Sequence, residues 1–269
     1  MNIFSSKIGI NVVSLRGIIG DLGRFQKGLT MENSSSLLER AFTLKKPKVV
    51  VIKINSPGGS PVQSELIYNK IRELAEKNKT KVITIAEDVA ASGGYLIACA
   101  GDEIYANSSS IVGSIGVIYS SFGFKDLIKK IGVDRRVYTA GKNKSTLDPF
   151  LEEKKEDIER LKNIQLDLHK DFIKVVEDSR GSKLNKSSGI ELFSGEFWSG
   201  SKSKELGLID GIGNVNEILK EKFGEDVVIK KFEKSKGWLS KKLSASNNGQ
   251  LDQIVNLLEE RSIWQRYGF

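Results

Sequence analysis

The hydrophobic residues in the first hundred positions follow two spacings in turn, one typical of strands and the other of helices. Continuous apolar, β-branched runs at 8–15, 48–54 and 81–86 predict buried strands. Residues 34–45 and 64–78 instead repeat apolar side chains at helical spacing, which predicts amphipathic helices. Strands and helices that alternate in this way form βαβ connections, so we expect a parallel sheet covered by helices.

The rest of the chain predicts shorter elements. We expect strands at 103–106, 111–119 and 135–138, and helices at 125–131, 152–180, 201–206 and 251–264. The lysine-rich stretch before the last helix is typical of a linker. We therefore divide the chain into a large α/β domain over 1–233, a basic linker over 234–249, and a C-terminal amphipathic helix and tail over 250–269.

The chain is basic but carries no nucleic-acid signature. Lysine and arginine number 42 against 34 acidic residues, a formal net charge of +8. No pattern of aromatic and basic residues typical of RNA or DNA recognition accompanies the excess, so we interpret it as a solvated surface and expect no nucleic-acid partner. A single cysteine excludes an internal disulfide and fits a reducing compartment, which favours a cytoplasmic protein. No apolar run reaches about 18 residues, so neither a membrane span nor a signal peptide is expected.

The third predicted strand leads into a turn of small residues around a serine. Ser92 has alanines before it and Gly93 and Gly94 after it, and an apolar, helix-like run follows at 95–100. Small neighbours allow a substrate backbone to approach the hydroxyl, and the first turn of a helix presents unbonded N–H groups. This layout is typical of a nucleophile at a strand-to-helix turn. The alternative is a tight turn in which Ser92 caps the helix, since serine is a favoured N-cap residue.

A reactive serine needs a base, and the chain contains one histidine. His169 lies beside an apolar position in the predicted helix at 152–180, which is more typical of a residue on a helix face. A Ser-His-Asp triad and a metal site built on histidines are therefore not expected. The remaining candidate base is a lysine, which can accept a proton only when neutral. The ordinary pKa of lysine is about 10.4, so such a base needs a desolvated site that lowers this value.

Four motifs, taken in order, resemble one known family. Residues 55–59 read Asn-Ser-Pro-Gly-Gly, 90–95 read Ala-Ala-Ser-Gly-Gly-Tyr, 112–117 read Val-Gly-Ser-Ile-Gly-Val, and 141–144 read Gly-Lys-Asn-Lys. Together they resemble the signal peptide peptidase A family of Ser-Lys peptidases, and the resemblance covers residues 8–216. It implies the α/β fold that this family shares with the Clp protease and the crotonases, with repeated ββα units, a parallel sheet and helices packed around it.

Matched residue by residue, the resemblance assigns a catalytic pair. Ser92 would be the nucleophile and Lys144 the general base. Lys142, two positions away, competes for the second role. Lys144 is preferred because its spacing to Pro149 also matches the family loop.

Three further positions follow from the same match. Ser114 corresponds to the serine that hydrogen-bonds the lysine amine. Gly59 and Gly93 would supply the two N–H groups of the oxyanion hole, where glycine allows the backbone to direct its N–H toward the tetrahedral oxygen.

The resemblance implies a serine endopeptidase that hydrolyses signal-peptide remnants or unfolded peptides, with no metal or other cofactor. Members of the family assemble as rings, so a homo-oligomeric ring is expected. The alternatives are a crotonase-type acyl-CoA enzyme and a non-catalytic scaffold on the same fold. Short members of the family usually carry an N-terminal membrane anchor, and this sequence shows no such segment.

The C-terminal end combines an apolar helical stripe with basic and aromatic residues. Residues 234–242 are basic around a tryptophan, and residues 263–269 form an aromatic and weakly basic end with Trp264, Tyr267 and Phe269. Three roles remain open for this end: packing on a neighbouring subunit, peripheral contact with an anionic membrane, or docking in the peptidase groove as a product-like tail.

Overall fold

The computed structural model describes residues 8–21, 28–225, 227–232 and 261–268. The chain forms two compact units, one made of Met1–Ile115 and Ile173–Phe269, the other of Gly116–Phe172. The predicted linker at 234–249 and most of the predicted helix at 251–264 lie outside the described residues, and residues 261–265 are helical.

The first unit is built on a sheet to which the described residues contribute eight strands. The strand order is β6-β5-β3-β2-β1-β8, and β4 pairs with both β3 and β7. The bounds are β1 (Ile8–Arg16), β2 (Val49–Ser56), β3 (Lys81–Ala91), β4 (Glu103–Ala106), β5 (Ile111–Gly113), β6 (Phe197–Ser199), β7 (Gly211–Ile212) and β8 (Val227–Phe232). Every pair is parallel except β5 with β6, which confirms the mainly parallel α/β fold expected from the sequence.

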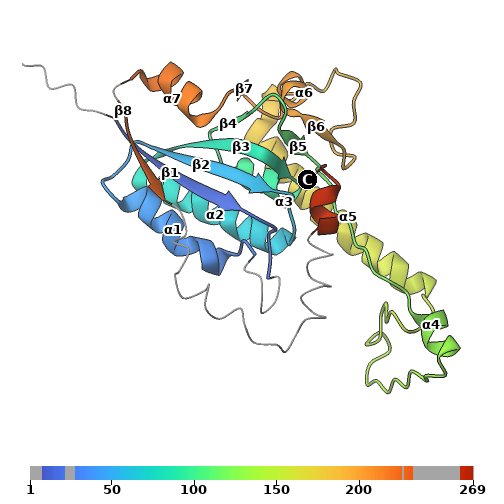
Figure 1. Ribbon diagram of the computed structural model, residues 1–269. Coiled ribbons are helices and arrows are strands. Elements are labelled where there is room, and N and C mark those ends of the chain that lie inside the picture. Colours follow the sequence, from blue (N-terminus) through green and yellow to red (C-terminus); the bar gives the residue numbers. More distant parts are fainter. Residues whose placement is uncertain (1–7, 22–27, 226, 233–260, 269) are drawn as a thin grey trace, which may run out of the picture. The chain divides into compact units, whose positions relative to one another are not determined.

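Helices cover both faces of this sheet (Figure 1). Those of the first unit are α1 (Met31–Thr43), α2 (Pro61–Asn78), α3 (Gly93–Ala98), α6 (Gly200–Glu205) and α7 (Val215–Phe223), with a short 3₁₀ helix at Gly181–Lys183. α5 (Lys155–Arg180) begins in the second unit and ends in the first. α2 starts in the favoured way, because Ser60 accepts a hydrogen bond from the Gln63 N–H and Pro61 occupies its first turn.

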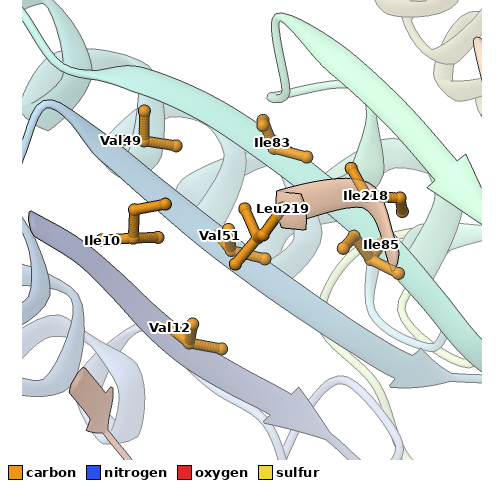
Figure 2. Close-up of a cluster of buried hydrophobic side chains, with 8 residues drawn as sticks. All are labelled: Ile10, Val12, Val49, Val51, Ile83, Ile85, Ile218 and Leu219. Atoms are coloured by element: carbon orange, nitrogen blue, oxygen red, sulfur yellow. The ribbon is translucent and has the colours of Figure 1, made fainter. Parts of the chain in front are cut away.

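A cluster of branched aliphatic side chains packs α7 onto one face of the sheet. Figure 2 shows Ile218 and Leu219 of this helix among alternate residues of β1, β2 and β3. The other members are Ile10, Val12, Val49, Val51, Ile83 and Ile85. Side chains alternate between the two faces of a strand, so the intervening residues, such as Val13 and Ile52, point to the opposite face, where they are also buried.

Several predicted boundaries are wrong, for local reasons. The strand predicted at 81–86 continues to Ala91, so the serine turn follows a longer strand than expected. The strand predicted at 111–119 ends at Gly113, because the next residue, Ser114, takes a φ of +54°, which lies outside the range of a β-strand. α7 and β8 are absent from the sequence prediction, since lysines on their exposed faces hide the buried positions.

The second unit contains α4 (Lys125–Lys130) and the first part of α5, joined by irregular chain. Arg135 forms an ion pair with Asp148 at 3.1 Å, and its guanidinium lies 5.4 Å from the centre of the Phe150 ring. The strand predicted at 135–138 does not form. Residues 116–172 are all described and contain no other strand to pair with it, and an unpaired strand has no hydrogen-bond ladder.

A helix that spans a membrane needs about 20 consecutive, predominantly apolar residues. Among the described helices, none is both long enough and apolar enough to cross a membrane.

Candidate active site

Two turns meet at the carboxyl ends of the neighbouring strands β2 and β3. A methyl group added at Gly58, in the first turn, would lie 2.7 Å from the Cβ of Ser92, in the second. Before the turns, the Asn55 side chain links the ends of the two strands, since its Nδ2 donates to Asp88 Oδ2 at 2.5 Å and its Oδ1 accepts from the Val89 N–H at 3.3 Å. The sequence predicted a turn at Ser92 after a strand, and the parallel pairing of β2 with β3 brings this turn and the one at Gly58 together.

Ser92 has an uncommon backbone conformation for a residue with a side chain. It joins β3 to α3 with φ 52° and ψ −125°, a region that non-glycine residues rarely adopt. Within the described part of the chain its hydroxyl makes no capping hydrogen bond to α3, although Ser92 occupies the N-cap position. The side chain is half-buried. A strained residue with a hydroxyl not used in capping argues against the capping alternative and favours a functional role.

The two glycines predicted for the oxyanion hole belong to the two turns, Gly93 directly after Ser92 and Gly59 in the turn after β2. Gly93 is the first residue of α3, so its N–H has no partner in the helical ladder. In the β-bridge between Ile19 and Gly59, the Ile19 N–H donates to the Gly58 oxygen and the Ser60 N–H donates to the Ile19 oxygen. Of the hydrogen bonds in this bridge between described residues, none uses the Gly59 N–H. Both glycines are closely packed: a Cβ would lie 2.0 Å from the Ile19 oxygen at Gly59 and 2.2 Å from Ser64 Oγ at Gly93.

Ser114 is brought near the serine turn by a backbone contact. The Ser92 N–H donates to the Gly113 oxygen at 2.8 Å, and Ser114 is the next residue along the chain. The Ser114 N–H in turn donates to the Glu196 oxygen at 2.6 Å, which fixes the segment to the loop before β6. The structure therefore brings Ser92, Gly59, Gly93 and Ser114 into one region of the first unit.

Lys144, the residue predicted as the base, belongs to the second unit. It lies on the irregular segment between α4 and α5, where its N–H donates to the Gly141 oxygen at 3.2 Å in a tight turn. Both Lys144 and its competitor Lys142 are exposed. The pairing of Lys144 with Ser92 stays a prediction from the family resemblance.

Other potentially reactive groups are accounted for by packing. Burial raises the pKa of the Cys99 thiol to about 12, so this residue is not a nucleophile near neutral pH. Tyr95 anchors α3, because its buried hydroxyl donates to the Leu208 oxygen at 2.7 Å. Over the residues that the structure describes, no group of three or more His, Cys, Asp or Glu side chains could hold a metal ion.

Three residues at this site were not predicted from the sequence. Gly58 fits directly against Ser92, and nothing in the motif favoured it over Gly59 as the closer neighbour. Tyr267 donates from its hydroxyl to Ser114 Oγ at 3.3 Å, and its ring meets that of Phe197 edge-on with centroids 5.1 Å apart. The aromatic composition of the C-terminal end was the available signal for the second contact.

Comparison with known families agrees with this geometry. The profile of peptidase family S49 matches residues 74–227, more than half of the chain. The chain belongs to peptidase family S49. Relatives of this S49 chain include "Protease 4" of Haemophilus influenzae, 32% identical over 78% of the chain and 34% of the relative. "Serine protease SPPA, chloroplastic" of Arabidopsis thaliana is 34% identical over 65% of the chain and 25% of the relative.

A solved structure shares the S49 chain's fold. A mutant of the 1510-N membrane-bound stomatin-specific protease superposes with a TM-score of 0.52 over 84% of this chain and 98% of its own. The sequence identity is 15%, so this likeness supports the Clp protease-like α/β fold alone.

Two relatives carry a name of another class. Proteins named "Na(+)/H(+) antiporter NhaA", from Brucella abortus and Brucella melitensis, are each 49% identical over 96% of this S49 chain. The match spans about a third of their length, 37% in each case.

Proposed function

We propose that this chain is a serine endopeptidase in which Ser92 is the nucleophile and Lys144 the general base. The observation that carries the proposal is the Ser92 turn: a strained serine whose hydroxyl is not used in capping, followed by Gly93 and packed against Gly58. Membership of the S49 peptidase family supports the same reaction class.

In the proposed mechanism the Ser92 oxygen attacks the carbonyl carbon of the scissile peptide bond while Lys144 accepts its proton. The Gly59 and Gly93 N–H groups donate to the oxyanion of the tetrahedral intermediate. The C–N bond then breaks, and the departing amine takes the proton from Lys144. Water, deprotonated by the same lysine, hydrolyses the resulting ester and returns Ser92 to its free form.

A neutral lysine needs shielding from water, and Lys144 is exposed in the single chain. We therefore include a homo-oligomeric ring in the proposal, in which neighbouring subunits cover the second unit. Exposed apolar side chains of that unit support an interface of this kind. They are Ile118, Phe122, Leu127, Ile131 and Val133, each more than half exposed.

The proposed substrates are signal-peptide remnants or unfolded peptides, and the proposed compartment is the cytoplasm. Such substrates suit a nucleophile in the turn at the carboxyl end of a strand, because an extended peptide can place its carbonyl beside Ser92. A single buried thiol with a raised pKa fits a reducing compartment.

Labelling with a fluorophosphonate tests the nucleophile directly. We expect mass spectrometry to locate the adduct on Ser92, and we expect the Ser92→Ala protein to remain unlabelled and to leave a signal-peptide library uncut. Hydrolysis of the library by the Ser92→Ala protein would contradict the proposal. A thermal shift with acyl-CoA in the absence of labelling would instead favour a crotonase-type enzyme.

A further inference from the structure

The described C-terminal segment, residues 261–268, lies against the strand end that carries Ser114. Tyr267 makes two side-chain contacts there: a hydrogen bond to Ser114 and an edge-on ring contact with Phe197. Figure 1 shows this short red helix beside β5 and β6. The contacted residues are themselves neighbours, because Gly113, the residue before Ser114, pairs with Phe197 across β5 and β6.

The chemistry of this contact concerns a group that the proposed mechanism needs. The Ser114 hydroxyl is the one expected to hold the amine of Lys144, and here its oxygen accepts from the Tyr267 hydroxyl at 3.3 Å. Ser114 also lies beside the nucleophile turn, because the Ser92 N–H donates to the oxygen of Gly113, the residue just before Ser114. A segment docked in this way and a peptide substrate would compete for the same space.

The contact is also weak enough to be reversible. Tyr267 is half-buried, while its neighbours Gln265 and Arg266 are exposed, and Phe197 keeps 43% of its surface exposed. The hydrogen bond and the aromatic pair that Tyr267 makes each contribute a modest free energy of binding. The Tyr267 N–H donates to the Trp264 oxygen at 3.0 Å, so the residue is held in the turn that ends the helix.

We propose that residues 261–268 are an internal competitor of peptide substrates, with Tyr267 occupying the surface formed by Ser114 and Phe197. The inference rests on the proposed function, because inhibition requires that a substrate be cleaved at Ser92. Peptides with an aromatic side chain at the matching position displace the segment most effectively, since they supply the same edge-on contact with Phe197.

Kinetics of the full chain test the inhibition. Tyr267→Ala should raise kcat/KM for a short fluorogenic peptide about tenfold, because both contacts are lost. Tyr267→Phe, which keeps the ring, should raise it about threefold. Gln265→Ala is the matched control: it alters an exposed residue of the same segment and should leave kcat/KM at the wild-type value. An unchanged or lower kcat/KM in Tyr267→Ala would overturn the inhibitory role.

A synthetic peptide of residues 261–269 provides the converse measurement. Added to the Tyr267→Ala protein, the natural peptide should inhibit competitively, and a peptide with alanine in place of the tyrosine should inhibit at least about threefold less well. Equal inhibition by the two peptides would show that Tyr267 does not occupy the site.

Hydrogen exchange measured by mass spectrometry separates docking from catalysis. In a Ser92→Ala background, Tyr267→Ala should speed exchange in peptides that cover residues 110–116 and 195–199, and Gln265→Ala should not. Unchanged exchange would refute docking, whatever activity the enzyme has. A third outcome is faster exchange in this background, together with a wild-type protein that is neither labelled by the fluorophosphonate nor able to cleave a peptide. This outcome would establish the docked segment but refute both the proposed function and the inhibition.

Discussion

The backbone N–H of Ser92 donates a hydrogen bond to the carbonyl oxygen of Gly113 at 2.8 Å, and this contact organises the candidate site. It joins the strained turn after β3 to the strand end that carries Ser114. The backbone N–H of Ser114 likewise donates to the carbonyl oxygen of Glu196. Backbone hydrogen bonds therefore position both serines, and no mobile side chain is needed for this. Rigid placement of this kind is what a nucleophile and an orienting hydroxyl require.

The proposed dyad predicts how three substitutions differ. Ser92→Ala and Lys144→Ala should each reduce kcat/KM by several orders of magnitude, because nucleophile and base act as a unit. The double variant should be no slower than either. Lys142→Ala removes an exposed lysine two positions away and should have a mild effect. An inactive Lys142→Ala enzyme together with an active Lys144→Ala enzyme would assign the base to the other lysine.

The pH profile of the reaction distinguishes a lysine base from a histidine base. We expect kcat/KM to rise with pH into the alkaline range, since the base must lose its proton before it can act. His169, the one histidine, should contribute nothing, so His169→Gln should give the same profile as the wild type. Steady-state kinetics across the neutral and alkaline range would show this. A profile that flattens in the His169→Gln protein would argue against the dyad.

Gly58 tests the close approach of the two turns. A methyl group at this position would lie 2.7 Å from the Cβ of Ser92, and the glycine has φ +100°. We expect Gly58→Ala to lower both kcat/KM and the free energy of unfolding, the latter by more than about 1 kcal/mol.

Gly17→Ala is the matched control for this change. Gly17 has a similar φ of +108° but nothing within 4 Å of an added Cβ, so its substitution introduces backbone strain without the clash. Chemical denaturation and peptide kinetics on both proteins would separate the two effects. Equal losses of activity would mean that the Ser92 contact is unimportant.

A buried ion pair secures the end of α5. The Arg180 guanidinium, with 1% of its side chain exposed, lies 2.8 Å from Asp210, and the Asp210 carboxylate also accepts from the Ile104 N–H at 2.8 Å. Arg180→Met leaves a partly buried carboxylate with a weaker partner, so the free energy of unfolding should fall by about 3 kcal/mol. Urea denaturation measures this loss.

Lys183→Met is the control for the Arg180 substitution. Lys183 contacts the same carboxylate at 2.8 Å, but its side chain is 45% exposed. Solvent screens such a pair, so its loss should cost less than about 1 kcal/mol. A cost as large as that of Arg180→Met would show that burial does not determine the difference.

The lowered pKa of Glu103 predicts that the folded protein loses stability in acid. Burial disfavours the charged form of this carboxylate, but hydrogen bonds from Lys222, Lys81 and Tyr105 outweigh it and lower the pKa of Glu103 from about 4.5 to about 2. A carboxyl whose pKa is lower when folded adds stability above its unfolded pKa, and this stability is lost as the pH falls toward about 2. The free energy of unfolding should therefore decline between about pH 4.5 and pH 2.

A glutamine at position 103 does not bind a proton in this pH range, so the free energy of unfolding of the Glu103→Gln protein should decline less steeply between the same pH values. Denaturant midpoints measured at several pH values would show the difference. Glu76→Gln changes an exposed carboxylate on α2 and should keep the wild-type pH dependence. Parallel curves for the wild type and Glu103→Gln would contradict the assignment.

Local pattern was sufficient for the alternation of strands and helices, the parallel sheet and the position of the Ser92 turn. Runs such as 48–54 are apolar on both faces, and the spacing of Ile67, Ile71 and Leu74 suits one helix face. These features depend on neighbours in sequence, which is why they can be read without coordinates. The short strands β6 and β7 could not be predicted, because two or three residues carry too little periodicity.

Tertiary structure decided the contacts between segments far apart in the chain. Gly58 fits against Ser92 because β2 and β3 pair in parallel and end at the same edge. Tyr267 reaches Ser114 across 153 positions, and Arg180 becomes buried through packing against the segment around Asp210. Such pairs depend on the register of the sheet and on which surfaces other elements cover. Every strand and helix contributes to both, so a short stretch of sequence does not determine them.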